Sequence, residues 1–91
     1  GLLVHNDCLK YANSVLRRHP DGVVMRMNPV GGKTINLPGY DNSIPNFHHY
    51  FHIKKGVVRD DTFRRGIDAD DYMKQLRELN PDLDFMFTPR L

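Results

Sequence analysis

The stretch at positions 47–61 constrains the fold most strongly, because it predicts a β-hairpin. Two short runs rich in aromatic and β-branched residues flank a Lys-Lys-Gly sequence at positions 54–56. Glycine tolerates the positive φ angle that a tight hairpin turn requires. The stretch also carries three histidines and two aspartates, namely His48, His49, His52, Asp60 and Asp61. We therefore expect an antiparallel sheet with a candidate functional site on its hairpin.

Alternation along the first hairpin strand divides its side chains between two faces. One face carries Phe47, His49, Phe51 and Ile53, and the other carries His48, Tyr50, His52 and Lys54. The first face is the more apolar one, so we expect it to pack against the helices. His49 is then directed inward, whereas His48 and His52 point away from the helices.

The register of the hairpin decides which aspartate lies beside His49. If the turn has two residues, Ile53 pairs with Val58, and Asp60 lies one diagonal step from His49. If the turn has three residues and a bulge, Asp61 comes opposite His49 instead. Either register places an aspartate near the inward histidine.

The single cysteine, Cys8, falls where a helix is predicted to begin. Asn6 or Asp7 can cap this helix, and Arg17 and Arg18 near its end suit the helix dipole. The exposed amide N–H groups at a helix N-terminus favour a thiolate over a thiol. One cysteine cannot form an internal disulfide, so the fold must be stable without one.

The rest of the chain predicts an α+β fold. A strand is expected at positions 23–27, a second helix from a cap at Asp68 to a stop at Asn80, and a final strand at positions 83–87. The segment at positions 38–46 is rich in Pro, Gly, Asn, Asp and Ser, so it predicts a loop that can wall a cleft. This order is typical of an antiparallel sheet packed on helices.

Length and composition restrict the chain to one domain over residues 1–91. Hydrophobic residues make up 40% and charged residues 26%, as in folded proteins. With a net charge of +2 and no long Lys/Arg run, nucleic acid is not the expected partner. The apolar runs are too short to span a bilayer, so membrane insertion by this domain is not expected. Because the chain starts with Gly, we expect a C-terminal fragment of a longer protein.

Cys8, His49 and Asp60 together suit thiol chemistry. A histidine beside a cysteine can take and return its proton, and a carboxylate behind the imidazole fixes its tautomer and stabilises the imidazolium. The three residues are candidates for nucleophile, general acid/base and orienting carboxylate, with the amide N–H of Cys8 as an oxyanion donor. His48 is the alternative histidine and Asp61 the alternative carboxylate.

The motifs around these residues occur in a particular order along the chain. They are Cys-x-x-x-Ala-x-x-x-Leu (Cys8, Ala12, Leu16), His49-Tyr50-Phe51, Gly-x-Val-x-Asp (Gly56, Val58, Asp60) and Gly66-Ile67 before a helix. This order resembles the papain-fold toxin domains of bacterial polymorphic toxins. The resemblance implies a papain-like minimal core, in which an N-terminal cysteine-bearing helix packs on an antiparallel sheet with a second helix.

The resemblance also implies an activity. Cys8, His49 and Asp60 would be the catalytic triad of a cysteine hydrolase that acts on an amide bond through a thioester, as a peptidase, a glutamine deamidase or an acyltransferase. The domain would be delivered into the cytoplasm of a target cell, as in contact-dependent inhibition. A cognate immunity protein would neutralise it, the substrate would be a protein or peptide-like molecule, and no cofactor is implied. The glutamine that papain-like proteases place before the cysteine has no counterpart, since Leu2 and Leu3 stand there.

Two other classes of function use the same stretch. A metal-independent ribonuclease toxin needs a histidine acid/base pair and a cation at the phosphate. Its candidates are His48, His49 and His52 with Lys54 or Arg59. A non-catalytic binding module would tolerate loss of both Cys8 and His49. A metal site is not expected, because only His48 and His52 share a strand face and no further pair has the spacing of metal ligands.

Overall fold

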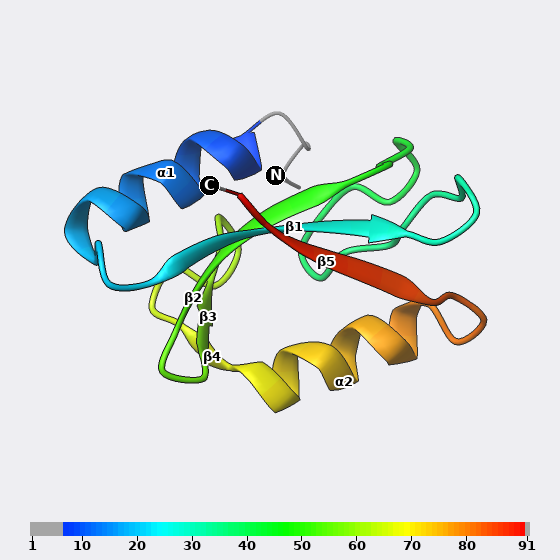
Figure 1. The fold of residues 1–91 in the computed structure, drawn as a ribbon. Helices are drawn as coiled ribbons and strands as arrows, with labels where there is room; N and C mark the ends of the chain where they lie inside the picture. The colour runs from blue at the N-terminus through cyan, green and yellow to red at the C-terminus, as the bar shows by residue number, and fades with distance from the viewer. Residues whose placement is uncertain (1–6, 91) are drawn as a thin grey trace.

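The computed structural model describes residues 7–90, which form a five-stranded antiparallel sheet and two helices (Figure 1). In chain order the elements are α1 (Asp7–Arg18), β1 (Val23–Pro29), β2 (His49–Lys54), β3 (Val57–Arg59), β4 (Ile67–Asp68), α2 (Ala69–Leu79) and β5 (Phe85–Arg90). The strand order is β4-β3-β2-β1-β5, and every pairing is antiparallel. The predicted α+β core, with a cysteine-bearing helix first and a second helix later, is confirmed. Within residues 7–90, each helix is too short or too polar to cross a membrane.

The two helices cover opposite faces of the sheet, so the expectation that one face of β2 meets the helices is wrong (Figure 1). Helix α1 packs against Val24 and Tyr50, whereas α2 packs against Met27 and Phe51. Tyr50 and Phe51 are neighbours in β2 and therefore point to opposite faces. The face of Tyr50 looked polar in the sequence, but tyrosine and histidine rings have apolar bodies that can be buried when their polar atoms find partners.

His52 is buried on this second face, although the sequence predicted that it points away from the helices. Its side chain is 0% exposed, and Nε2 donates a hydrogen bond to the backbone carbonyl of His19 at 3.1 Å. A carbonyl oxygen only accepts, so this bond also fixes which ring nitrogen carries the proton. His52 thereby fastens the turn between α1 and β1 to the sheet.

The turn after α1 leaves no space for a side chain at Gly22, so Gly22→Ala is expected to destabilise the protein. A Cβ atom there would overlap the ring of His52 and come within 2.9 Å of the carbonyl oxygen of Ile53. We expect a loss of about 3 kcal/mol in the free energy of unfolding, measured by urea denaturation. Gly31→Ala is the control, since a Cβ there meets no atom within 4 Å and only its φ of 83° costs about 1 kcal/mol. Equal stability of the two variants would contradict this packing.

The hairpin follows the first of the two predicted registers. Ile53 pairs with Val58, and Lys55 and Gly56 form a two-residue turn with φ angles of 49° and 76°. Two positive φ values are typical of a type I′ turn, whose twist matches that of the strands. The three-residue register with a bulge is therefore wrong. The β2–β3 ladder ends at Arg59, so the chain leaves the sheet at the next residue.

The C-terminal half of the chain matches the prediction in part. Asp68 caps α2 by accepting a hydrogen bond from the N–H of Asp70 at 3.1 Å, and α2 ends before Asn80, as expected. The last strand is shifted, because β5 runs from Phe85 to Arg90 and includes Pro89. Proline lacks an N–H group, and β5 tolerates it at the edge of the sheet that residues 7–90 form.

Candidate active site

His49 opens β2 and binds Asp60 inside the protein. Both side chains are buried, at 0% and 2% exposure, and Nε2 of His49 lies 3.0 Å from Oδ2 of Asp60. The two-residue turn produces this contact, because it brings the residue after β3 back toward the start of β2. The structure therefore places together the histidine and the aspartate that the first register predicted.

The carboxylate of Asp60 accepts hydrogen bonds on both oxygens. Oδ1 accepts from the backbone N–H groups of Thr62 and Phe63 at 2.9 and 2.8 Å, and Oδ2 accepts from His49 and from the hydroxyl of Tyr72 at 3.2 Å. Burial raises the pKa of Asp60, but its hydrogen bonds to His49, Phe63 and Thr62 and the charge of His49 lower it by more. Asp60 is thus ionised, and Nε2 of His49 is the donor in their bond.

Cys8 lies in the first turn of α1, as predicted, and its side chain interacts with His49. The helix begins at Asp7, and the other predicted cap, Asn6, lies outside the described residues. Cys8 is 1% exposed and acts on His49 as a side-chain hydrogen-bond partner. Nε2 of His49 is hydrogen-bonded to Asp60. Within the described residues, Nδ1 has no partner at ordinary hydrogen-bond distance and angle. Nδ1 is therefore the ring nitrogen that remains for Cys8.

The pKa of His49 lies at about 9, above its usual 6.5. Burial lowers this pKa, but hydrogen bonds to Asp60 and Cys8, together with the charges of both groups, raise it by more. His49 therefore carries a proton at neutral pH. A protonated imidazole beside a cysteine can donate its proton to a leaving group, which is the role of a general acid.

This raised pKa predicts a loss of stability at alkaline pH. A group whose pKa is higher in the folded state stabilises that state fully below its unfolded value, and the contribution disappears as the pH rises through the folded value. For His49 the window runs from about 6.5 to about 9. Urea denaturation across this window should show the free energy of unfolding falling by at most about 3 kcal/mol. In His49→Gln the fall should be absent. Transfer of the Cys8 proton to His49 in the folded state would offset part of the fall, so a free energy of unfolding that rises across this window is the outcome that would contradict the assignment.

Asp61, the alternative to Asp60, binds a different side chain. The hydroxyl of Tyr40 lies 2.6 Å from both carboxylate oxygens of Asp61. The ring of Tyr40 meets that of His49 edge-on, with centroids 5.3 Å apart. Burial raises the pKa of Asp61, and burial together with Asp61 raises that of Tyr40, so the tyrosine keeps its proton. Asp61 therefore holds Tyr40 against the histidine.

The residues of the ribonuclease alternative do not gather around His49. His48 is half-buried with its ring edge-on to Tyr50, at a centroid distance of 5.4 Å. Lys54 pairs with Asp21 at 3.1 Å at the far end of β2, about 16 Å along the strand from His49. His52 is buried on the α1 face, and Arg59 pairs opposite it in the β2–β3 ladder. His52, Lys54 and Arg59 thus lie near one another around His19, away from His49, so the three histidines do not share one position.

His49, Asp60 and Asp61 offer nitrogen and oxygen atoms within 4.8 Å of one another, which is close enough for a metal site. Their hydrogen bonds show how these atoms are used. Both oxygens of Asp60 accept from protein donors, and both oxygens of Asp61 face Tyr40. A cation would have to displace these donors, so the arrangement fits a hydrogen-bonded acid/base group better than a metal centre.

Sequence reasoning missed two residues of this site, Tyr40 and Tyr72. Tyr72 lies in the predicted second helix, and Tyr40 lies in the Pro- and Gly-rich segment before β2. The available signal was that a buried tyrosine hydroxyl usually needs an acceptor. Two tyrosines near two adjacent aspartates satisfy that need.

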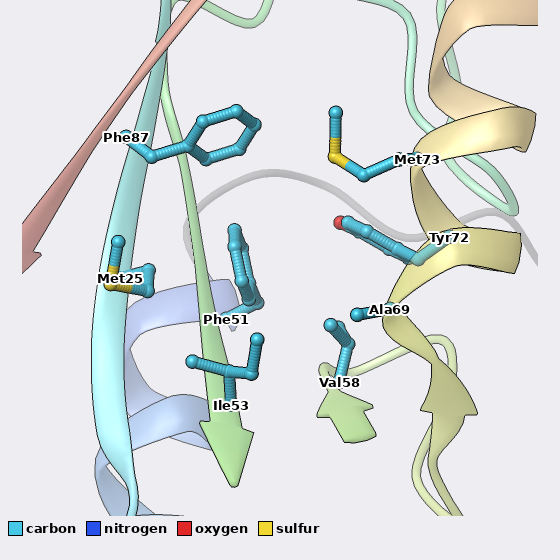
Figure 2. A pocket seen from close by; sticks show the side chains of 8 residues that line it. All are labelled: Met25, Phe51, Ile53, Val58, Ala69, Tyr72, Met73 and Phe87. Carbon is cyan, nitrogen blue, oxygen red and sulfur yellow. The ribbon is translucent and has the colours of Figure 1, made fainter. Parts of the chain in front are cut away.

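A cavity of about 190 Å³ lies beside the site, between the sheet and α2 (Figure 2). Apolar side chains line it, including Phe51, Val58, Met73 and Phe87. The ring of Tyr72 extends from α2 into the same lining (Figure 2). The hydroxyl of Tyr72 donates to Asp60, so this residue connects the apolar interior to the polar site.

The chain matches no protein-family model, and no curated protein or solved structure is detectably similar to it. The geometry itself defines a class: a small α+β domain whose interior holds a cysteine, a protonated histidine and an ionised aspartate in contact. These three residues are the basis for assigning a function.

Proposed function

We propose that the chain is a papain-like cysteine hydrolase of the bacterial toxin class, with Cys8 as nucleophile, His49 as general acid/base and Asp60 as orienting carboxylate. The observation that supports this most directly is the position of His49. Its Nε2 donates to Asp60 at 3.0 Å, and its other nitrogen is left for the thiol at the start of α1. Each residue thus has the partner that its proposed role requires.

In the proposed first step, the thiolate of Cys8 attacks the carbonyl carbon of an amide. The electron pair of the C=O bond moves to oxygen, where the backbone N–H of Cys8 is the proposed donor to the oxyanion. His49 then gives its Nδ1 proton to the leaving nitrogen as the C–N bond breaks. The products are a free amine or ammonia and a thioester on Cys8.

In the second step, water or another nucleophile attacks the thioester while His49 removes its proton. The C–S bond breaks, and Cys8 leaves as a thiolate beside a protonated His49, as at the start. Water attack on a peptide-derived thioester gives peptide hydrolysis, and on a glutamine-derived thioester it gives deamidation. Attack by an amine or a hydroxyl group gives acyl transfer.

Substrate access requires a conformational change, since Cys8 and His49 are 1% and 0% exposed. Tyr40 lies against His49, and the segment that carries it connects β1 to β2. This segment is attached by the bond from Tyr40 to Asp61 and by a bond from the hydroxyl of Thr62 to the carbonyl of Pro38 at 3.1 Å. We infer that these contacts open when a substrate binds.

The toxin assignment is supported by the motif order around Cys8, His49 and Asp60. Such a domain acts in the cytoplasm of the target cell on a protein or peptide-like substrate, and an immunity protein protects the producing cell.

The test compares two neighbouring histidines in the full chain. We expect His49→Ala to abolish growth inhibition in the cytoplasm of a host cell, because no other group can replace its proton transfer. His48→Ala is the matched control and should keep activity within about threefold. If both variants lose activity while Cys8→Ala keeps it, the ribonuclease replaces the thiol mechanism. If all three keep activity, the chain is a binding module.

A further inference from the structure

Helix α2 contributes one side chain to the site, through the hydroxyl of Tyr72. This hydroxyl donates to Oδ2 of Asp60 at 3.2 Å, and the same oxygen accepts from Nε2 of His49 at 3.0 Å. The other oxygen of Asp60 is held by two backbone N–H groups of its own loop. Tyr72 is therefore the donor that ties the carboxylate to a distant element.

The ring of Tyr72 is held firmly enough to position its hydroxyl. It is 1% exposed and packs against Phe51 and Phe63, with ring centroids at 5.5 and 5.9 Å. Burial and the charge of Asp60 raise the pKa of Tyr72, so the hydroxyl keeps its proton at physiological pH. Tyr72 is thus a permanent donor to Asp60.

We propose that Tyr72 is a positioning residue of the site, whose hydroxyl orients Oδ2 of Asp60 toward Nε2 of His49 and so keeps Nδ1 directed at the thiol of Cys8. Its consequence for catalysis rests on the proposed function. Two donors share Oδ2, so each reduces the negative charge available to the other. Removing the hydroxyl of Tyr72 leaves more of that charge to stabilise a protonated His49, while the carboxylate loses one of its four constraints.

The test removes only the oxygen atom, in the variant Tyr72→Phe of the full chain. The pKa of His49, followed by NMR of its ring carbons, should rise by about half a unit to one unit. The rate at which iodoacetamide alkylates Cys8 at neutral pH should fall by about tenfold, because the imidazole is held less well. A residue needed only for packing would change neither quantity. A pKa of His49 that stays constant or falls overturns the proposal.

Two further proteins complete the test. Tyr11→Phe is the matched control, since it deletes a hydroxyl that bonds the backbone carbonyl of Arg64 at 3.4 Å, and it should leave the pKa of His49 unchanged. Fluorotyrosine at position 72 keeps the ring and is a stronger hydrogen-bond donor, so it should lower the pKa of His49. If Tyr72→Phe does not fold, the fluorotyrosine protein tests the positioning role instead. If these shifts occur while Cys8→Ala retains activity, the positioning role stands and the proposed hydrolase fails.

Discussion

Cys8→Ala should abolish the activity of the chain, lowering its rate by about 10⁴-fold or more. The thiolate forms the covalent intermediate in the proposed reaction, and alanine offers no atom that can do so. The measurement is growth inhibition by the full chain, together with mass spectrometry of target-cell proteins to detect cleaved or deamidated products. Full activity in Cys8→Ala would rule out the thiol mechanism.

The control for Cys8→Ala separates loss of the thiol from loss of stability. Cys8 is buried against Val24 and Tyr50, so removing its sulfur also removes some packing, at an expected cost of about 1 kcal/mol. Val15→Ala makes a cavity in the same helix at a residue that is 0% exposed, and it should cost at least as much stability. We expect Val15→Ala to remain active at a temperature where both variants are folded. If Val15→Ala is also inactive, the loss in Cys8→Ala reflects folding.

Asp60→Asn is expected to reduce both activity and stability strongly. The amide oxygen can still accept from Thr62 and Phe63, which leaves the NH₂ group facing Nε2 of His49 and the hydroxyl of Tyr72. The oxygen of Tyr72 can accept from this NH₂ group, but the N–H at Nε2 of His49 cannot. His49 must therefore carry its proton on Nδ1 and can no longer accept one from Cys8. Activity should fall by about 10⁴-fold, the effect of such a tautomer change in a serine protease.

The stability loss in Asp60→Asn should be about 3 kcal/mol, because the buried ion pair between Asp60 and His49 and its hydrogen bond are lost. Asp61→Asn is the matched control, since it makes the same chemical change one residue later. Its amide oxygen can still accept the hydroxyl proton of Tyr40, so activity should stay within about tenfold. Urea denaturation and growth inhibition measure the two effects. If Asp61→Asn is the more damaging change, Asp61 is the orienting carboxylate.

The elements of this fold could be predicted because their signals are local. Helix capping at Asp68, the helical position of Cys8 and the turn at positions 55 and 56 each depend on residues within a few positions along the chain. For the same reason, the sequence limited the hairpin to two registers, one of which places Asp60 beside His49. Strand β4 escaped prediction, since two residues are too few for any alternation to show.

The sequence by itself determined that an α+β chain carries a cysteine at a helix start and a histidine with two aspartates on a hairpin. Only the tertiary structure decided that α1 and α2 lie on opposite faces, that His52 is buried, and that Asp60 pairs with His49 while Asp61 pairs with Tyr40. The physical reason is that these outcomes depend on which apolar surfaces bury one another. That choice is made between residues far apart in the chain, where periodicity and turn propensity carry no information.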